Sequence, residues 1–152
     1  MLSWYSLVLF IHILAAVMGL GTAFGFPLLA RSAKNATQAK FTLELLKNME
    51  IMPKVGSITL LLTGIILAIQ EPDLFTTGWY IASIVLYLLA QVIVIGMFPK
   101  FANAQMAVLE NHRTEDIPSE FRVIGKKSLQ WELVTHFLAF LLILLMVFKP
   151  TF

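Results

Sequence analysis

The feature that most constrains this chain is an uncharged run near its beginning, because no charged side chain occurs from Trp4 to Ala30. Three further apolar stretches follow, at about 55–70, 79–98 and 133–148. A helix of roughly 20 apolar residues crosses a hydrocarbon core about 30 Å thick, and backbone polar groups in lipid must be satisfied within the segment. The sequence therefore predicts an all-α fold, a four-helix transmembrane bundle formed by one domain, 1–152.

Composition agrees with a protein that is solvated by lipid. Hydrophobic residues make up 59% of the 152 residues and charged residues 13%, against about 25% charged in soluble domains. A water-soluble chain of this length has too small an interior to bury so much apolar surface. The chain has no cysteine, which excludes disulfides, iron–sulfur clusters and thiolate metal sites. The first apolar run is too long for a secretory signal and lacks a basic flank, so we expect it to be retained as the first span.

The basic residues predict the orientation in the membrane. Between the second and third spans there are only acidic charges, Glu71 and Asp73. Ten of the eleven basic residues follow the first or the third span: Arg31, Lys34, Lys40, Lys47, Lys54, Lys100, Arg113, Arg122, Lys126 and Lys127. Loops rich in Lys and Arg stay in the cytoplasm, which predicts a bacterial inner-membrane protein with both termini outside. Four aromatic residues are then expected to form an outer belt, Trp4, Tyr5, Trp79 and Tyr80, with Trp131 at the inner face.

The cytoplasmic loops are themselves expected to be largely helical. FTLELLKNME reads as a short amphipathic helix before Pro53, and FANAQMAVLENH can continue the third span beyond the membrane. Pro118 suits the first turn of a helix that leads into the fourth span. Several helices therefore extend into the cytoplasm. Their basic faces could contact anionic lipid, although a solvated face is the reading we favour.

A weak internal repeat also runs through the sequence. GFPLLARSA resembles MFPKFANAQ, and LLTGIILAI resembles LVTHFLAFL at the same offset. Two helical hairpins related by duplication would explain both similarities, and chance matching of short apolar strings is the alternative.

Two histidines lie within the apolar spans. His12 shares a helix face with Ala16, Gly19 and Ala23, small residues on which a second transmembrane helix can approach closely. His12 is therefore expected to point into the bundle. His136 shares a face with Glu132, Ala139 and Met146, and Glu132, one turn earlier, is placed to accept a hydrogen bond from a ring nitrogen and fix the tautomer.

Ionisable residues inside a membrane are functional candidates by default. Two inward histidines in an otherwise uncharged bundle favour haem b, since neutral imidazole is a common axial ligand in bundle cores. His12 and His136 are thus the predicted iron ligands. The alternative is that each histidine only hydrogen-bonds a neighbouring helix.

The depths of the two histidines argue against a single haem held by both. At 1.5 Å rise per residue they differ by about 14 Å. Two separate sites, or one haem on one histidine, fit better. Met146 lies at the expected level of His12, which makes a His/Met site conceivable, and Gln91 lies at the level of His136 on a polar stripe of the third span. His112 is interpreted as a solvated loop residue without a role.

No catalytic motif for nucleotide, metalloprotease or hydrolase chemistry occurs in the sequence, so whether the protein is an enzyme stays open. The net charge of +2 gives no reason to expect nucleic acid. The predicted partners are the lipid bilayer and a redox partner or a second copy of the chain. Haem-linked electron transfer or redox sensing is the leading hypothesis. A non-catalytic accessory or assembly subunit with structural histidines is the alternative, and a small-molecule or metal carrier is a third class.

The segments FIHILAAVMGLGTAFGFPLLAR, MPKVGSITLLLTG and LLILLMVFKP resemble an uncharacterised family of bacterial predicted integral membrane proteins, over essentially the whole chain. The shared pattern is a histidine in the first span, proline then glycine in the second, and a closing Lys-Pro. More distantly the chain is similar to the membrane domain of copper-resistance protein D and to the HemJ-type protoporphyrinogen oxidase. The latter resemblance implies haem and a role for His12. The residues around His12 and the loops depart from the HemJ type, which argues against oxidase activity.

Overall fold

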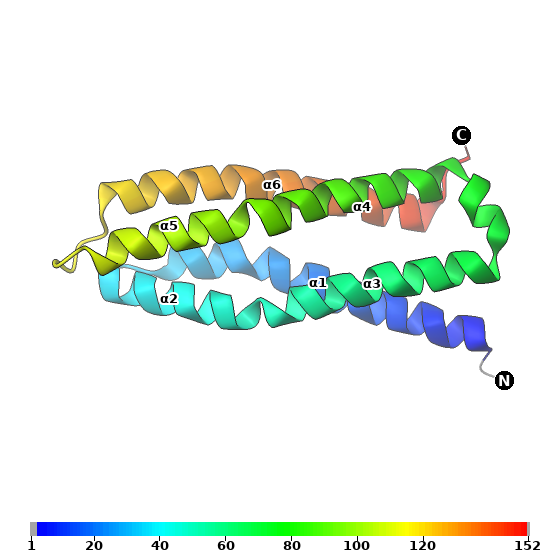
Figure 1. Ribbon diagram of the computed structural model, residues 1–152, viewed down its shortest axis with the longest axis horizontal. Helices are drawn as coiled ribbons and strands as arrows, with labels where there is room; N and C mark the ends of the chain where they lie inside the picture. The colour runs from blue at the N-terminus through cyan, green and yellow to red at the C-terminus, as the bar shows by residue number, and fades with distance from the viewer. Residues whose placement is uncertain (1–2, 152) are drawn as a thin grey trace.

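The computed structural model describes residues 3–151, which form helices connected by short turns and contain no strand. The elements are α1 (Trp4–Ser32), α2 (Ala36–Met49), α3 (Ile51–Gln70), the 3-10 helix η1 (Pro72–Thr76), α4 (Gly78–Gly96), α5 (Phe98–Glu110) and α6 (Ser119–Phe148). Only Glu50 separates α2 from α3, and only Met97 separates α4 from α5; both have right-handed helical backbone angles. Figure 1 accordingly shows α2 running on into α3, and α4 into α5, along the length of the molecule.

The helix ends follow from local sequence. Ser3 caps α1 by accepting a hydrogen bond from the Ser6 amide at 3.1 Å, and Asn35 caps α2 through the Gln38 amide at 2.8 Å. Such side chains satisfy amides that have no partner within the helix. Pro118 immediately precedes α6, as the sequence predicted, and α6 ends at Phe148, before Lys149, whose φ of 44° is left-handed.

These helical stretches are longer than a membrane is thick. The α2–α3 pair covers 35 residues, about 52 Å at 1.5 Å per residue, against a hydrocarbon core of about 30 Å. Four helices are long and apolar enough to span a membrane, and only 6–22% of their most apolar windows is buried inside the protein. The remaining apolar surface needs a lipid solvent. The predicted bundle of four spanning helices with extensions is confirmed.

The bundle consists of two helical hairpins. In the first, α1 packs against α3; in the second, α4 packs against α6. The helices within the first hairpin touch at their backbones, because a Cβ added to Gly56 would lie 2.6 Å from the Gly19 nitrogen. Between α3 and α4, by contrast, no Cα atoms of the described residues come within 8 Å. We call the boundary between the two hairpins the seam.

The two hairpins have the arrangement that the internal repeat predicted. Thr63 and Thr135 occupy equivalent places in the repeated strings, and both are buried. Each hydroxyl donates to its own helix: Thr63 to the Thr59 carbonyl at 2.6 Å, and Thr135 to the Glu132 carbonyl at 2.9 Å. Threonines within helices commonly form such bonds, so the duplication hypothesis stays a prediction.

Aromatic side chains form a small core at one end of the bundle. The start of α1 and the end of α6 lie at one end of the bundle, while α2 and α5 reach the other (Figure 1). At the former end, Trp79 and Tyr80 are only 8% and 5% exposed and pack around Ala68. The predicted outer aromatic belt stays a prediction, but Trp79 and Tyr80 are core residues at this end, whereas Trp4 is 65% exposed. The Lys149 ammonium lies 5.6 Å from the centre of the Trp79 ring.

Candidate functional site

His12 lies on the face of α1 that packs against α3. Its Nδ1 is 2.8 Å from the Thr63 hydroxyl oxygen, and a Cβ added to Gly64 would lie 3.4 Å from its Cε1. The small residues Ala15 and Gly19, one and two turns further along the same face, bring α3 close enough for this contact. The sequence prediction that His12 points into the bundle is confirmed.

His136 joins α6 to α1 across the seam. Its Nε2 lies 3.3 Å from the Ala23 carbonyl oxygen, and its ring stacks on Phe24 with the centroids 4.5 Å apart and the planes at 19°. Offset stacking of this kind contributes about 0.5–1.5 kcal/mol beyond the buried area. His136 therefore helps to hold the two hairpins together.

The two histidines lie at different depths in the bundle. Because His136 contacts α1 at Ala23, it lies about 16 Å further along that helix than His12, at 1.5 Å per residue. This separation agrees with the estimate of about 14 Å from the sequence. At this separation the two rings cannot both bind the iron of one haem.

Glu132 does not orient His136. Its carboxylate accepts a hydrogen bond from the Ser128 hydroxyl at 2.9 Å, and the ring nitrogen of His136 turns instead to the Ala23 carbonyl. The predicted Glu132–His136 bond is therefore wrong. Residues four positions before and four positions after Glu132 are equally close on a helix, and here the earlier one takes the carboxylate. Met146, the other candidate on this helix, is 37% exposed on the surface of the bundle.

A group of polar side chains bridges α3 and α4 across the seam. The Tyr87 hydroxyl donates to the Ser57 carbonyl at 2.9 Å and lies 2.6 Å from the Ser57 hydroxyl. The Gln91 amide donates to the same Ser57 hydroxyl at 2.8 Å. One turn of α3 is thus bonded to two turns of α4. The predicted polar stripe of the third span exists, but Gln91 is engaged with Ser57, and Ser83 bonds its own helix at the Trp79 carbonyl.

His112 has more contacts than the sequence suggested. Its Nε2 is 2.8 Å from the Thr114 hydroxyl and 3.3 Å from the Asp116 carboxylate. The Thr114 hydroxyl, which donates to Asp116, holds the pKa of that carboxyl below its usual range, with a smaller contribution from His112. The spacing His-x-Thr-x-Asp could have indicated this closed turn. We find no group of three or more His, Cys, Asp or Glu side chains able to hold a metal ion in residues 3–151.

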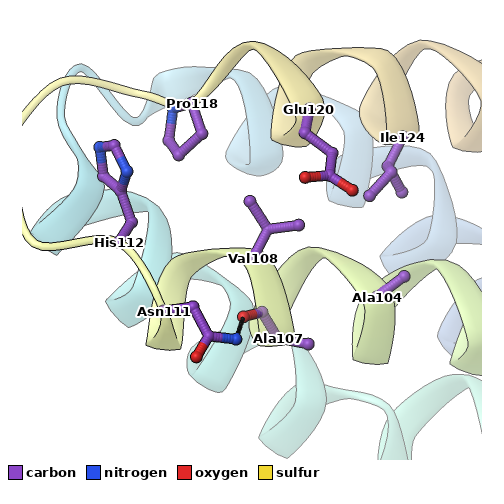
Figure 2. A pocket seen from close by; sticks show the side chains of 8 residues that line it. All are labelled: Ala104, Ala107, Val108, Asn111, His112, Pro118, Glu120 and Ile124. Atoms are coloured by element: carbon purple, nitrogen blue, oxygen red, sulfur yellow. Dashed lines mark hydrogen bonds between the residues drawn. The ribbon is translucent and has the colours of Figure 1, made fainter.

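His112 also lines an open groove between α5 and α6, shown in Figure 2. The small side chains of Ala104 and Ala107 form one wall and Glu120 and Ile124 the other, while His112 and Pro118 close one end. A second pocket lies beside Trp79 and Pro150 at the opposite end of the molecule. Neither pocket is lined by His12, His136 or Gln91, so the cavity that a carrier reading predicts gains no support from them.

The chain matches one family of known proteins. Residues 6–150 match the model of the family described as "Predicted integral membrane protein (DUF2269)". The chain belongs to this family. The predicted resemblance to a family of integral membrane proteins is thereby confirmed. No curated protein and no solved structure matches the chain, so the distant similarities to copper-resistance protein D and to the HemJ type stay predictions.

Haem remains an expectation from the sequence, and the histidines of this DUF2269 member can be compared with what an iron ligand requires. An axial imidazole binds iron through one ring nitrogen while the other donates to the protein. His12 meets the first part of this requirement, because Thr63 engages its Nδ1, and the Leu60 backbone is a further hydrogen-bond partner of the ring. The contact at Nδ1 is compatible with an iron-binding role for His12. Neither His136, at another depth, nor the surface-exposed Met146 fits as its partner.

Proposed function

We propose that this integral membrane protein binds haem b and serves in electron transfer or in sensing a redox-active ligand. His12 is the first-choice axial ligand, and His136 would serve only a separate site. The observation that carries the proposal is the hydrogen bond between His12 Nδ1 and Thr63 inside the bundle, since it orients the ring and leaves Nε2 available. Haem, when bound, supplies one-electron chemistry at its iron.

An absorption spectrum tests this proposal. Protein purified from membranes in detergent, and then titrated with haem, is expected to show a Soret band that His12→Gln removes. His136→Gln is the matched control, because it changes the other intramembrane histidine and should retain the band. Absence of a Soret band in the native chain, even after haem titration, contradicts the proposal.

A second candidate is a non-catalytic accessory or assembly subunit whose histidines are structural. It is favoured by the absence, within residues 3–151, of any buried polar side-chain atom without a hydrogen-bond partner. Histidines that only bridge helices would be expected to show this pattern. In this case His12→Gln and His136→Gln leave the unfolding midpoint and partner binding nearly unchanged, and haem titration gives no Soret band.

We further propose that the protein lies in the bacterial inner membrane with α2 and α5 in the cytoplasm and both termini outside. The support is the basic residues, ten of eleven of which lie in or beside α2, α5 and the first half of α6. Since the chain has no cysteine, single variants can report the topology. In intact cells an impermeant maleimide is expected to label Thr151→Cys but to label Ser119→Cys only after permeabilisation. The reverse pattern contradicts the orientation.

A further inference from the structure

We infer that Thr63 and the Ala23 carbonyl hold the two intramembrane histidines in opposite tautomers, so that only His12 presents its distal nitrogen, Nε2, as a lone-pair donor. Thr63 is then the positioning residue of the site. This inference deepens the proposed function, on which only the identity of the ligand depends. The tautomers themselves follow from the hydrogen-bond network.

The direction of the His12–Thr63 bond follows from the single proton of the hydroxyl. The Thr63 oxygen lies 2.6 Å from the Thr59 carbonyl and 3.2 Å from the Leu60 carbonyl. A carbonyl can only accept, so the hydroxyl proton is directed at Thr59. We assign the same oxygen as the acceptor at its 2.8 Å contact with His12, so that Nδ1 of His12 carries the proton.

The second proton of an imidazolium is absent at this position. His12 takes part in neither of the ion pairs of the described residues, which are Lys54–Glu50 and His112–Asp116. An uncompensated charge within a transmembrane segment is costly. His12 is thus neutral, with its one proton on Nδ1 and a lone pair on Nε2. Because Thr63 is only 6% exposed, water does not compete for its oxygen.

The same reasoning gives His136 the other tautomer. The Ala23 carbonyl can only accept, so the nitrogen at 3.3 Å, Nε2, carries the proton. A neutral His136 then has its lone pair on Nδ1, next to its own backbone, with Phe24 covering one ring face. His136 thus donates its Nε2 proton to a neighbouring helix, whereas His12 keeps the Nε2 lone pair that a ligand role needs.

Thr63→Val tests the positioning role, because it keeps the shape of the side chain and removes the acceptor. Thr63→Ser keeps the acceptor. Thr135→Val is the matched control: Thr135 is similarly buried, at 8% exposed, and its hydroxyl bonds carbonyls of its own helix but forms no hydrogen bond with a histidine ring. Only Thr63→Val is expected to release the Nδ1 proton of His12.

The readout is the ring ¹⁵N spectrum of the full-length protein in nanodiscs, with labelled histidine and no added haem. His12→Gln and His136→Gln variants assign the signals. We expect a protonated Nδ1 and bare Nε2 for His12 and the reverse for His136. Thr63→Val is expected to move His12 toward the Nε2–H form, whereas Thr63→Ser and Thr135→Val leave it unchanged. A native His12 protonated at Nε2 overturns the inference, and so does a Thr63→Val spectrum like that of the native protein.

Haem titration of the same variants separates this inference from the proposed function. Loss of the oriented partner of a metal-binding histidine weakens affinity by about 10–100-fold, so this loss is expected for Thr63→Val and not for Thr135→Val. If the native protein shows no Soret band but the predicted tautomers, the haem proposal fails and the tautomer assignment stands. If it binds haem with equal affinity in both variants, Thr63 is not a positioning residue.

Discussion

Gly56→Ala tests whether the backbone contact between α1 and α3 sets the geometry of the site. A Cβ at position 56 would lie 2.6 Å from the Gly19 nitrogen, 2.7 Å from the Gly19 Cα and 2.9 Å from the Ala15 carbonyl oxygen. All three are backbone atoms of α1, so no side-chain rotation relieves the overlap. The two helices must move apart by about 1 Å to restore optimal contacts of 3.5–4.0 Å.

Overpacking of this kind costs about 1–3 kcal/mol, and the better helix propensity of alanine offsets up to about 1 kcal/mol. We therefore expect Gly56→Ala to lower the free energy of unfolding by up to about 2 kcal/mol. Thr63 lies two turns from Gly56 on the same face of α3. A shift of about 1 Å would stretch the 2.8 Å bond between His12 and Thr63 beyond hydrogen-bonding length, so the His12 ring signals should change as well.

The assay is reversible unfolding in mixed micelles, followed by helicity, with two matched controls. Gly19→Ala changes the same interface, but its Cβ would meet Gly56 and Ser57 backbone atoms at 3.4 Å, an ordinary contact, and should be nearly neutral. Gly21→Ala adds a Cβ with nothing within 4 Å. If Gly56→Ala is as stable as Gly21→Ala, the described approach of α1 and α3 is wrong. Equal destabilisation by Gly19→Ala and Gly56→Ala also contradicts the geometry.

Three further variants test other contacts. Tyr87→Phe removes the bonds to Ser57. Because interhelical hydrogen bonds in membranes average about 0.6 kcal/mol with a maximum near 1.7, the free energy of unfolding in the same micelles should fall by an amount in this range. An unchanged free energy of unfolding contradicts the seam contact. Phe24→Leu removes the stacking on His136. A double-mutant cycle with His136→Gln should give a coupling energy of about 0.5–1.5 kcal/mol between the two rings, and a coupling energy of zero refutes the stacking contribution. Asp116 has a depressed pKa in the fold, so its stabilisation is present above the unfolded pKa of about 3.9 and is lost as the pH falls through the folded pKa. Thermal unfolding of Asp116→Asn should therefore be less sensitive to pH below about 4 than that of the native protein, and identical profiles contradict the turn.

The spans and their extensions could be predicted because both follow from one-dimensional patterns. An uncharged run such as that from Trp4 to Ala30 has few folds available in lipid. The amphipathic run before Pro53 and the start of the last helix at Pro118 are likewise local signals, and both correspond to helices, α2 and α6. The inward direction of His12 was predictable because small residues marked its face.

The sequence could not predict which of several equally near residues a side chain contacts. Glu132 has both Ser128 and His136 within one turn, and the rotamer that decides between them depends on where α1 lies. Trp79 and Tyr80 have the depth of interfacial aromatics, but their burial depends on which faces of α4 meet α6 and η1. Predicting the hydrogen-bond partner of His12 would have required knowledge of the register between α1 and α3. That register is set by the Gly19–Gly56 contact and not by any pattern within one span.

The internal repeat and the two tautomers lead to one account of how the halves differ. In the repeated strings the position of Gly64 corresponds to His136, and Thr63 corresponds to Thr135. In the first hairpin the glycine leaves room beside the His12 ring, and the threonine receives that ring. In the second hairpin the equivalent threonine has no such histidine, and the equivalent glycine is replaced by a histidine that reaches across the seam to Ala23. The first half therefore holds its imidazole within the hairpin, against Thr63, while the imidazole of the second half contacts the first half at Ala23, so the two histidines have different structural roles.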